Sequence, residues 1–549
     1  MELDPRTIIT TASTLAERLG DEAYYAAACL RSGLLPPASP QAYAGVALAL
    51  GRFGLLGGSI SASAFLHADR VVVIDELGQL SYRELADRVD SLATAWQERG
   101  LRPGDGVTLI ARIHRGVLQA FFAAAKLGAR IILLNTSFSG PQIVDVAQRE
   151  GTDLLVYDEE YAPMLGAFEP RLGRFLSFLD GGDAAARDET LEALAARTPA
   201  RSLPRPSQQP KVVILTSGTT GRPKGAGRDI RLSLAPVGGL LGKVPFRTEE
   251  VTQISAPVFH ALGFAHMILG VVLGSTLVLQ RSFDPARTLD SLERNRVTAF
   301  VAVPVMLQRM LDLGEEAWAG RDLSSLRIVF LSGSQLGAEL AQRAVARLGP
   351  VIYNLYGSTE VAYATIATPE DLAAAPASVG RVVRGSIVKI LGEDGAERPS
   401  GQTGRIFVAN ANQFEGYTGG GTKEQIGGLM ASGDVGHFDE HGRLFIDGRD
   451  DEMIISGGEN VFPAEVEELL SHHAGVVEVA AIGVPDEQFG QRLRAFVVRR
   501  QDVDVTEQDL KDFVRENLAR YKVPREVVFV EELPRNPTGK ILKRELQSR

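Results

Sequence analysis

Short apolar runs alternate with helical patterns from about residue 60 to residue 357. In a first series, the apolar runs that predict strands cover 71–75, 106–113, 130–135 and 153–158. A second series begins at 251 and repeats the alternation. Between the strands, the pattern over 81–100 predicts a helix that begins at Ser81, with Glu84 three residues later. Strands that alternate with helices indicate a mostly parallel sheet with helices on its faces, so we expect two similar α/β lobes.

The pattern changes beyond about residue 380, where short strands are separated by Gly-rich turns. We expect a small β subdomain there, then a polar hinge at 448–452 and a small, mobile α+β domain. Residues 180–209 are rich in Ala, Arg, Asp and Pro and are interpreted as a surface connection. The predicted fold class is α/β, with an N-terminal extension over 1–59, a large two-lobed domain over 60–449 and a small C-terminal domain over 450–549.

Composition narrows the class of protein. A chain of 549 residues exceeds one hydrophobic core, which agrees with several domains. The net charge is −10 and no long Lys/Arg block occurs, so nucleic acid is not an expected partner. A single cysteine, Cys29, excludes an internal disulfide framework and fits a cytoplasmic location. The N-terminus lacks the basic-then-apolar pattern of a signal peptide.

The longest uncharged stretch runs from Ser32 to Gly51, and Pro36, Pro37 and Pro40 interrupt it. These prolines argue against a membrane-spanning helix. The apolar segment at 42–57 is expected to pack on the body of the protein. Peripheral contact with a membrane surface is the alternative interpretation.

The stretch TSGTTGRPKG at 216–225 follows an apolar strand and is rich in glycine and hydroxyl side chains. Glycines let the backbone approach an anion closely, and successive N–H groups form an anion-binding concavity. The common P-loop pattern fails, because Pro223 precedes Lys224 and Gly225 follows it. Alone, the stretch is either a phosphate-binding loop or a flexible surface turn.

Four further motifs follow: YGSTE at 356–360, ASGD at 431–434, GRDDEMIISGGENVFPAEVE at 448–467 and PRNPTGKILKREL at 534–546. Open α/β sheets bind ligands at the carboxyl ends of their strands, where the first motif is expected. Glu360 offers oxygen ligands to a metal ion, and Asp434 offers acceptors to ribose hydroxyls. Taken singly, the YGSTE motif is better explained as a strand exit and Lys540 as a solvated surface lysine, and Asp434 is also explained as a turn aspartate.

In this order, the five motifs resemble those of the adenylate-forming superfamily, in its acyl-CoA synthetase branch, and most of all bacterial fatty-acyl-CoA synthetases. The resemblance covers about residues 60–549. It implies a loop around the ATP phosphates made of Thr216, Ser217, Gly218, Thr219, Thr220, Gly221 and Lys224. It also implies a nucleotide site made of Gly333, Ser334, Tyr356, Gly357, Ser358, Thr359, Glu360, Asp434, Arg449 and Lys540.

Particular roles follow from the same resemblance. Tyr356 would stack on adenine, Asp434 and Arg449 would hold the ribose, and Thr216 and Glu360 would hold Mg²⁺. The implied catalytic residues are Lys540, His260, Lys224 and Thr359. His260 would stand at the mouth of the acyl pocket, with a packed core histidine as the alternative. Asp451 would be the hinge residue, and Gly457 and Gly458 would line a pantetheine tunnel.

Three departures from the family pattern occur. AGRDIRLS stands where a Thr/Ser-His pair often follows the glycine loop, Met430 replaces a common tyrosine, and Glu452 replaces the second hinge aspartate. None of them alters a proposed phosphate contact.

The resemblance implies ATP-dependent activation of a carboxylic acid to acyl-AMP, followed by transfer to coenzyme A, with ATP, Mg²⁺ and CoA as cofactors and co-substrates. Residues 257–274 hold no ionisable side chain except histidine, which favours a hydrophobic acid, and we expect a medium- or long-chain fatty acid. Three alternatives remain: an aryl-CoA ligase, a fatty-acyl-AMP ligase that serves a carrier protein, and a non-enzymatic nucleotide-binding regulator. The last predicts loss of Lys540, Glu360 or the hinge, all of which are present.

Overall fold

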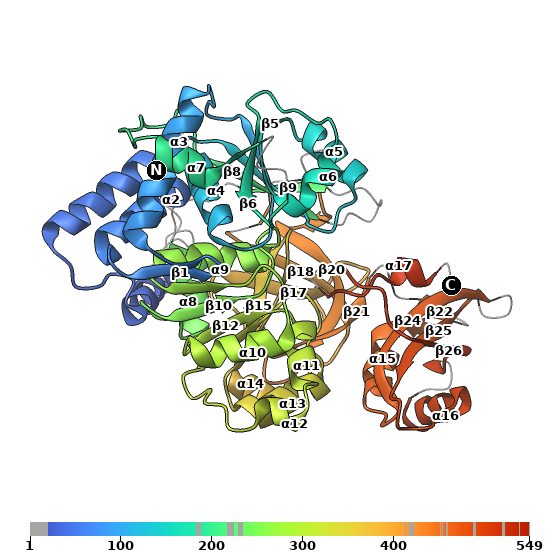
Figure 1. Cartoon of the computed structure of the whole chain (residues 1–549). Helices are drawn as coiled ribbons and strands as arrows, with labels where there is room; N and C mark the ends of the chain where they lie inside the picture. The colour runs from blue at the N-terminus through green and yellow to red at the C-terminus, as the bar shows by residue number, and fades with distance from the viewer. Residues whose placement is uncertain are drawn as a thin grey trace, which may run out of the picture. The chain divides into compact units, whose positions relative to one another are not determined.

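The computed structural model describes residues 20–182, 188–216, 224–228, 234–411, 413–414, 416, 422–450, 452, 454–456, 459–486, 490–518, 522–536 and 539–547 (Figure 1). The chain divides into two compact units. The first comprises Met1–Ala302, Leu313–Phe330 and Ala411–Thr422, and the second comprises Val303–Asp312, Leu331–Asn410 and Lys423–Arg549.

The first sheet of unit 1 has seven strands in the order β7-β6-β5-β3-β4-β8-β9. Their bounds are β7 Glu189–Thr190, β6 Arg174–Phe178, β5 Thr152–Asp158, β3 Gly106–Ile110, β4 Arg130–Leu133, β8 Lys211–Thr216 and β9 Lys224–Arg228. All neighbours are parallel except β8 and β9, which are antiparallel. The accompanying helices are α4 Arg115–Lys126, α5 Gly140–Arg149, α6 Ala162–Leu165 and α7 Leu191–Arg197, with a 3-10 turn, η1, at Glu159–Tyr161.

The second sheet of unit 1 runs in the order β13-β12-β10-β11-β1-β2. Its strands are β13 Ile328–Leu331, β12 Ala299–Ala302, β10 Val251–Ile254, β11 Thr276–Leu279, β1 Val71–Asp75 and β2 Gly78–Ser81. The helices of this part are α3 Tyr82–Glu98, α8 Leu234–Lys243, α9 Ala261–Val272, α10 Pro285–Arg294 and α12 Glu315–Trp318. Ser81 caps α3, and its capping box with Glu84 is complete, as predicted. Two α/β lobes are therefore confirmed.

The interpretation of 180–209 as a plain surface connection is wrong in part. Residues 189–197 form β7 and α7, and Thr190 caps the helix by accepting a hydrogen bond from the Ala193 amide. Leu191 and Leu194, three residues apart, bury one face of α7. Two leucines in a polar context were too weak a periodic signal to predict this short helix.

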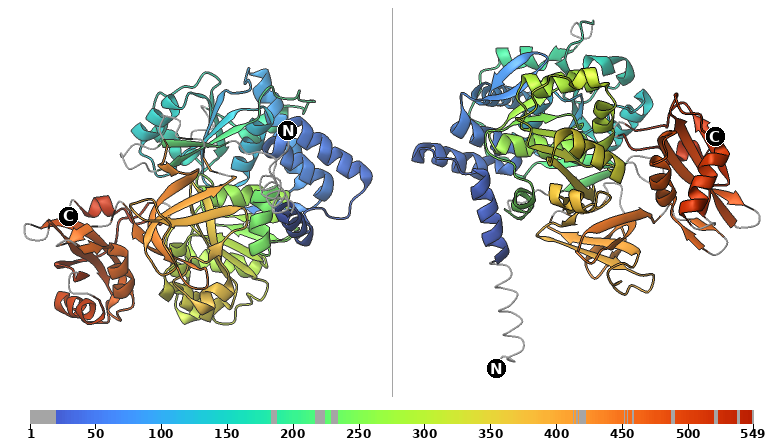
Figure 2. Two further views of the ribbon diagram at one scale, coloured as in Figure 1. Left: turned by 180° about the vertical axis from the view of Figure 1, so that it is seen from behind. Right: turned by 90° about the horizontal axis from the view of Figure 1, so that it is seen from below.

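Helix α2, Pro40–His67, is kinked at Gly54, whose φ of 70° suits glycine (Figure 2). Its two halves pack on each other, since a Cβ on Gly45 would lie 2.7 Å from the Phe65 ring. The second half is mostly buried, whereas the predicted packing segment at 42–57 is buried only in part: Ala49, Phe53, Leu56 and Gly57 are buried, and Leu48 is 66% exposed. Among the described residues, α2 alone is long and apolar enough to cross a membrane by length and composition, and 44% of its most apolar stretch is buried.

Unit 2 contains three groups of strands. β14 Ile352–Ser358, β15 Ala362–Ala367 and β16 Arg381–Val382 pair antiparallel. The second group is an antiparallel sheet of β17 Ser386–Leu391, β18 Gly404–Asn410, β20 Leu429–Phe438, β19 Gln425–Ile426 and β21 Leu444–Arg449. It confirms the predicted β subdomain. The helices of this part are α11 Pro304–Leu311, α13 Ala338–Leu348 and α14 Pro369–Ala374.

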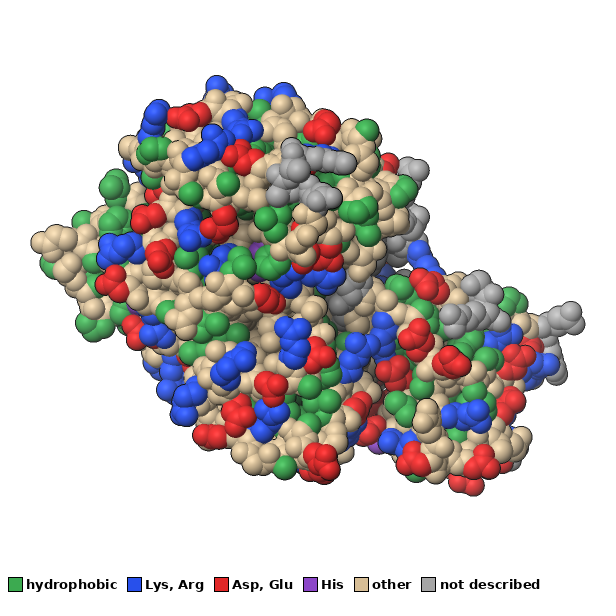
Figure 3. Space-filling model, viewed as in Figure 1, with side chains coloured by type: hydrophobic (Ala, Val, Ile, Leu, Met, Phe, Trp, Pro, Cys, Tyr) green, Lys and Arg blue, Asp and Glu red, His purple; other side chains and the backbone are tan. Residues whose placement is uncertain are grey.

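The C-terminal part of unit 2 is an α+β unit, as predicted. Its strands are β23 Glu459–Val461, β22 Ile454–Ser456, β25 Gly490–Arg499, β24 Val476–Asp486 and β26 Glu526–Val530. Its helices are α15 Pro463–Ser471, α16 Glu507–Asn517 and α17 Lys543–Leu546. The domain boundaries at 59 and 449 stay predictions. On the face shown in Figure 3, basic and acidic side chains are interspersed.

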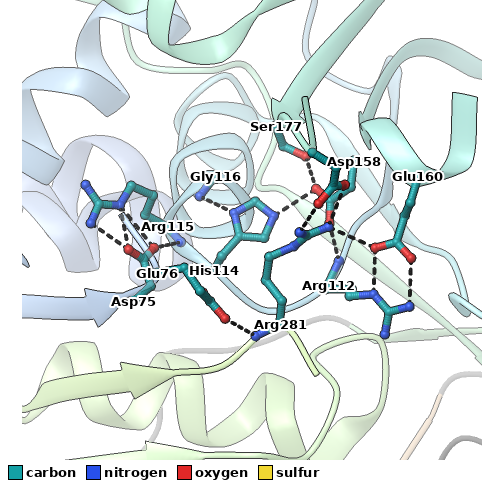
Figure 4. Close-up of polar contacts among 11 residues, drawn as sticks. Asp75, Glu76, Arg112, His114, Arg115, Gly116, Asp158, Glu160, Ser177 and Arg281 are labelled. Atoms are coloured by element: carbon teal, nitrogen blue, oxygen red, sulfur yellow. Dashed lines mark hydrogen bonds and ion pairs between the residues drawn. The ribbon is translucent and has the colours of Figure 1, made fainter. Parts of the chain in front are cut away.

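A buried carboxylate lies at the carboxyl ends of the strands of the first sheet (Figure 4). Asp158, at the end of β5, is fully buried and accepts hydrogen bonds from Ser177 Oγ (2.7 Å) and from the Arg112 amide (2.9 Å). His114 Nε2 lies 2.8 Å from the same carboxylate. Because His114 Nδ1 accepts a hydrogen bond from the Gly116 amide, the imidazole proton is on Nε2 and is donated to Asp158.

Arg281 joins this cluster to the second sheet of unit 1. It follows β11, and its guanidinium donates to Glu160 (2.9 Å; Figure 4). The same guanidinium donates to Asp180 (2.5 Å) and lies over the Phe178 ring. Burial acts to raise the pKa of Asp158, but His114, Ser177 and the Arg112 amide outweigh it and lower the pKa below its ordinary value.

We predict that Asp158→Asn destabilises the protein by about 3–5 kcal/mol at pH 7, because one partner of a buried charge network is removed. The folded-state pKa of Asp158 lies below its unfolded value of about 3.9, so its stabilisation is present above that pH and is lost as the pH falls through the folded pKa. Urea unfolding should therefore show that the free energy of unfolding differs less between the variant and wild type at pH 3 than at pH 7. Asp145→Asn, at an exposed ion pair, is the control. If the variant and wild type differed in free energy of unfolding by the same amount at both pH values, the stabilising role of the Asp158 carboxylate would be contradicted.

Candidate active site

Three of the predicted nucleotide-site residues meet at one carboxylate in unit 2. The Tyr356 hydroxyl, from β14, donates to Asp434 Oδ2 (2.6 Å), and Arg449 Nη1, from β21, donates to Asp434 Oδ1 (2.9 Å). Asp434 and Arg449 are also direct partners in the β20–β21 ladder. A carboxylate offers about four lone-pair positions, and these two bonds use two of them. The arrangement leaves acceptor capacity for a pair of ligand hydroxyls.

Tyr356 is poised as a donor rather than as an anion. The pKa of its phenol is raised well above the ordinary value, first by withdrawal from water and then by the neighbouring Asp434 carboxylate. The phenol therefore stays protonated at neutral pH. Its hydroxyl proton orients the Asp434 carboxylate. The resemblance assigns the ring of Tyr356 to stacking on adenine.

The turn after β14 holds Ser358, Thr359 and Glu360 in a fixed geometry. Ser358 Oγ donates to Glu360 Oε2 (2.9 Å) and accepts from the Glu360 amide (3.2 Å). Asn410, at the end of β18, donates from Nδ2 to the Val361 carbonyl (2.7 Å) and so fixes the same turn. Asn410 was missed by the sequence analysis, because nothing near it in the chain marks its partner.

Two glycines of the predicted site have steric reasons to be glycine. A Cβ on Gly357 would lie 1.9 Å from the Ala362 carbonyl oxygen, because β14 and β15 approach closely there. Gly333 has a φ of +96°, a conformation that L side chains rarely adopt, and Ser334 follows it. The preceding Ser332 Oγ donates to the Leu355 carbonyl (2.9 Å). This stretch therefore lies beside β14.

Glu360 fits a Mg²⁺ ion by donor chemistry. Mg²⁺ prefers oxygen ligands and is usually held by one or two carboxylates together with substrate phosphates. In the described part of the chain, no group of three or more His, Cys, Asp or Glu side chains is placed to hold a metal on its own. One carboxylate that acts together with a bound nucleotide is therefore the arrangement that these residues permit. The Thr216 side chain, its predicted partner, lies outside the described residues.

In unit 1 the structure describes only the base of the glycine-rich loop. Thr216 ends β8 and Lys224 begins β9, and the two are paired in the antiparallel ladder. The strands on either side of the loop are therefore antiparallel neighbours. Ser217, Gly218, Thr219, Thr220 and Gly221 lie outside the described residues, as do Asp451, Gly457 and Gly458, and their roles stay predictions.

His260 precedes α9, also in unit 1, and its ring lies 4.6 Å from that of Phe259 between centroids. Burial lowers its pKa to about 4, and Nε2 has no hydrogen-bond partner among the described residues. His266, on α9, has its pKa lowered to about 4 for the same reason. Both rings are therefore neutral at pH 7. His260 would act as an uncharged ring or acceptor and not as a cation.

Lys540 is exposed in the C-terminal part of unit 2. Its amide donates to Asn536 Oδ1 (2.9 Å), and its carbonyl accepts from the Asn536 amide (2.9 Å). Gly539 has a φ of +76°, as the turn requires. Asn536 was not predicted. The signal available was its Asn-Pro step, which favours a turn.

The chain is similar to known proteins in sequence and in fold. The model of the AMP-binding enzyme family matches residues 60–418, and that of the AMP-binding enzyme C-terminal domain matches 465–540. A feruloyl-CoA synthase from Amycolatopsis sp. is 34% identical over 86% of this chain and 94% of its own. The long-chain-fatty-acid–CoA ligase FadD13 from Mycobacterium tuberculosis is 30% identical over 84% and 90%. The solved amide bond synthetase McbA from Marinactinospora thermotolerans is 27% identical, with a TM-score of 0.79 over 91% and 99%.

We predict that Tyr356→Phe raises the KM for ATP about tenfold, because Asp434 loses the donor that orients it and hydrogen bonds to charged groups are worth about 1.5–3 kcal/mol. Initial rates across ATP concentrations measure the effect. Tyr157→Phe is the matched control, since it removes another phenol–carboxylate bond, to Asp188 in unit 1. A KM that stays at the wild-type value in Tyr356→Phe would refute the orienting role.

Proposed function

The chain belongs to the AMP-binding enzyme family and is an AMP-forming acid–thiol ligase that acts through an acyl or aryl adenylate with ATP, Mg²⁺ and CoA, and from this premise we propose that its acid is hydrophobic. The supporting observation is the character of 257–274. In this segment the only ionisable side chains are His260 and His266, and both are neutral at pH 7. A second charge on the acid would find no partner there, and burying it unpaired is costly.

Within that class, a medium- or long-chain fatty acid is our first candidate, and the name of FadD13 supports it. An aryl acid is the second candidate. Aromatic rings gather along α9, where His266 lies 4.6 Å from Phe330 and 5.6 Å from Phe246 between centroids. The name of the feruloyl-CoA synthase relative supports an aryl acid as well.

The proposed chemistry assigns each residue one task. A carboxylate oxygen of the acid bonds to the α-phosphorus of ATP, and pyrophosphate leaves. Mg²⁺, held by Thr216 and Glu360, would neutralise phosphate charge. Lys540 and Lys224 would place ammonium groups where negative charge develops, and Thr359 would donate to the α-phosphate. Asp434 would accept from the ribose hydroxyls while Tyr356 and Arg449 hold its carboxylate in place.

In the second half-reaction, a thiolate sulfur bonds to the acyl carbon, and AMP leaves with an oxygen from the acid. CoA is the proposed acceptor, and Gly457 and Gly458 would line the approach of its pantetheine arm. A carrier-protein acceptor is the alternative, favoured by a relative named fatty acid–[acyl-carrier-protein] ligase ScoC from Streptomyces coeruleorubidus, 31% identical over 87% of this chain. Both acceptors present the same thiol chemistry.

Cytoplasmic location and peripheral membrane contact through 42–57 stay predictions. Exposed Leu48, on the first half of α2, is the side chain in that segment most suited to meet lipid. Loss of vesicle co-sedimentation in Leu48→Ser, with activity retained, would support such contact.

We predict that ATP–pyrophosphate exchange depends on a hydrophobic carboxylic acid. A panel of fatty, aryl, amino and dicarboxylic acids should give exchange only with the first two groups, because the segment at 257–274 offers no counter-charge. Repeating the panel with CoA and measuring thioester separates the CoA ligase from an enzyme that serves a carrier protein. Exchange driven chiefly by amino or dicarboxylic acids would refute the hydrophobic assignment.

We predict that Lys540→Ala slows pyrophosphate exchange about 10²- to 10³-fold, the usual cost of losing one preorganised donor at developing charge. Thioester formation from supplied acyl-AMP and CoA should stay within about twofold of wild type, because adenylation is bypassed. Lys389→Ala, an exposed lysine paired with Glu397 in the β subdomain, is the control. Equal slowing of both half-reactions would mean that Lys540 is not specific to adenylation.

A further inference from the structure

The described residues 534–536 and 539–542, here called the lysine loop, are joined by hydrogen bonds and include Lys540. The Gly539 amide donates to the Asn536 carbonyl (2.8 Å), and the Leu542 amide donates to the Pro534 carbonyl (2.8 Å). Arg535 Nη1 donates to the Gly539 carbonyl (2.5 Å) inside the loop. These hydrogen bonds tie Lys540 to the residues on either side of it, so its position also depends on how those residues are attached to their domain.

The entry of the lysine loop is attached to β24. Arg535 Nη2 lies 3.1 Å from Glu478 Oε2, and both side chains are about one-fifth exposed. The exit of the loop leads directly into α17, Lys543–Leu546. A helix of four residues does not hold its own conformation in water, so its attachment must come from tertiary contacts. Leu546, fully buried, supplies one such contact against the core that includes Ile482 and Phe496.

Lys543 supplies the other contact, through an ammonium group shared by two carboxylates. Its Nζ lies 2.6 Å from Glu452 Oε2 and 2.9 Å from Glu467 Oε1 on α15. Lys543 and Glu467 are each 19% exposed and Glu452 is 31% exposed. Burial acts to lower the pKa of Lys543, but the two carboxylates outweigh it and raise the pKa above its ordinary value. The ammonium group therefore stays charged, and it offsets the repulsion between the Glu452 and Glu467 carboxylates.

The cluster of Lys543, Glu452 and Glu467 lies next to the predicted hinge, because of where Glu452 stands in the chain. Glu452 directly follows Asp451, the predicted hinge residue. On the other side, Asp450 is attached to the β subdomain: its Oδ2 accepts from Arg405 Nε (2.9 Å), and its amide donates to the Gly433 carbonyl (3.0 Å). Residue 451 therefore stands between one neighbour attached to the β subdomain and another attached to the lysine loop.

We propose that Lys543, Glu452 and Glu467 form a positioning triad that fixes the lysine loop to the first residue after the hinge, so that Lys540 is placed accurately for adenylation. The inference rests on the proposed role of Lys540. None of the three side chains is assigned contact with substrate. They act through the position of Lys540, and a displacement of about 1 Å at such a group costs on the order of 10²-fold in rate.

The test uses the full chain and four single variants. Lys543→Met removes the charge and keeps the length, Lys543→Arg keeps the charge, and Glu452→Gln weakens the triad while leaving Glu467 in place. Lys511→Met is the matched control, since Lys511 pairs with Glu507 on α16 in the same domain and is similarly buried. For each variant, kcat and KM of pyrophosphate exchange, thioester formation from supplied acyl-AMP, and thermal unfolding are measured.

Lys543→Met is expected to lower the kcat of exchange at least about tenfold while the KM for ATP and thioester formation stay within about twofold. Lys543→Arg should recover most of the rate, Glu452→Gln should fall between Lys543→Met and wild type, and Lys511→Met should match wild type. In a Lys540→Ala background, Lys543→Met should not lower the rate of pyrophosphate exchange further, because the effects of residues that act through one group are not additive.

The outcomes separate this inference from the proposed function. If Lys540→Ala leaves exchange unchanged, the proposed role of Lys540 fails. If Lys540→Ala slows exchange but Lys543→Met and Glu452→Gln lower only the unfolding temperature, the triad is structural and the inference is overturned. Equal slowing by Lys543→Met with and without Lys540 would overturn it too.

Discussion

The carboxylate of Asp434 is the point on which the nucleotide side of the site depends. It accepts hydrogen bonds from Tyr356 on β14 and from Arg449 on β21, and thereby joins two groups of strands that are separate in the sheet topology. The bond to Tyr356 keeps the residue assigned to adenine beside the residue assigned to ribose. The bond to Arg449 fixes the end of β21, shortly before the predicted hinge residue. A single charged group therefore sets the geometry of two proposed ligand contacts and of the last fixed residues before the small domain.

A second set of charges begins immediately beyond that point. Asp450 is bound to Arg405, and Glu452 is bound to Lys543, 91 residues later in the chain. In the proposed chemistry, adenylation would need Lys540 near the α-phosphate, and thiolysis would need an open approach to the acyl carbon. Asp450 is therefore attached to the β subdomain, and Glu452 is attached to the helix that follows the lysine loop. A loosely attached loop would lose accuracy in the first half-reaction without helping the second.

The sequence was most informative where the structure depends on local pattern. The capping box of Ser81 and Glu84, the α/β alternation and the antiparallel β subdomain each follow from residues close together in the chain. The structure also brings together Tyr356, Asp434 and Arg449, which the resemblance had assigned to one nucleotide. What could not be predicted depends on distant partners. The sequence analysis did not single out Lys543, because its partners Glu452 and Glu467 are distant in the chain, and Asn410 had no local sign of the turn it fixes. The short helix α7 was missed because two leucines give too short a periodic pattern.

The central claim is that an oxygen of the carboxylic acid attacks the α-phosphorus of ATP and leaves with AMP. Incubating the enzyme with ATP, CoA and an acid labelled with ¹⁸O in both carboxylate oxygens tests it most directly, with mass spectrometry of the products. The account predicts one ¹⁸O atom in AMP, one in the acyl thioester and none in pyrophosphate. Unlabelled AMP, or label in pyrophosphate, would contradict the adenylate route and the roles assigned to Lys540, Glu360 and Asp434.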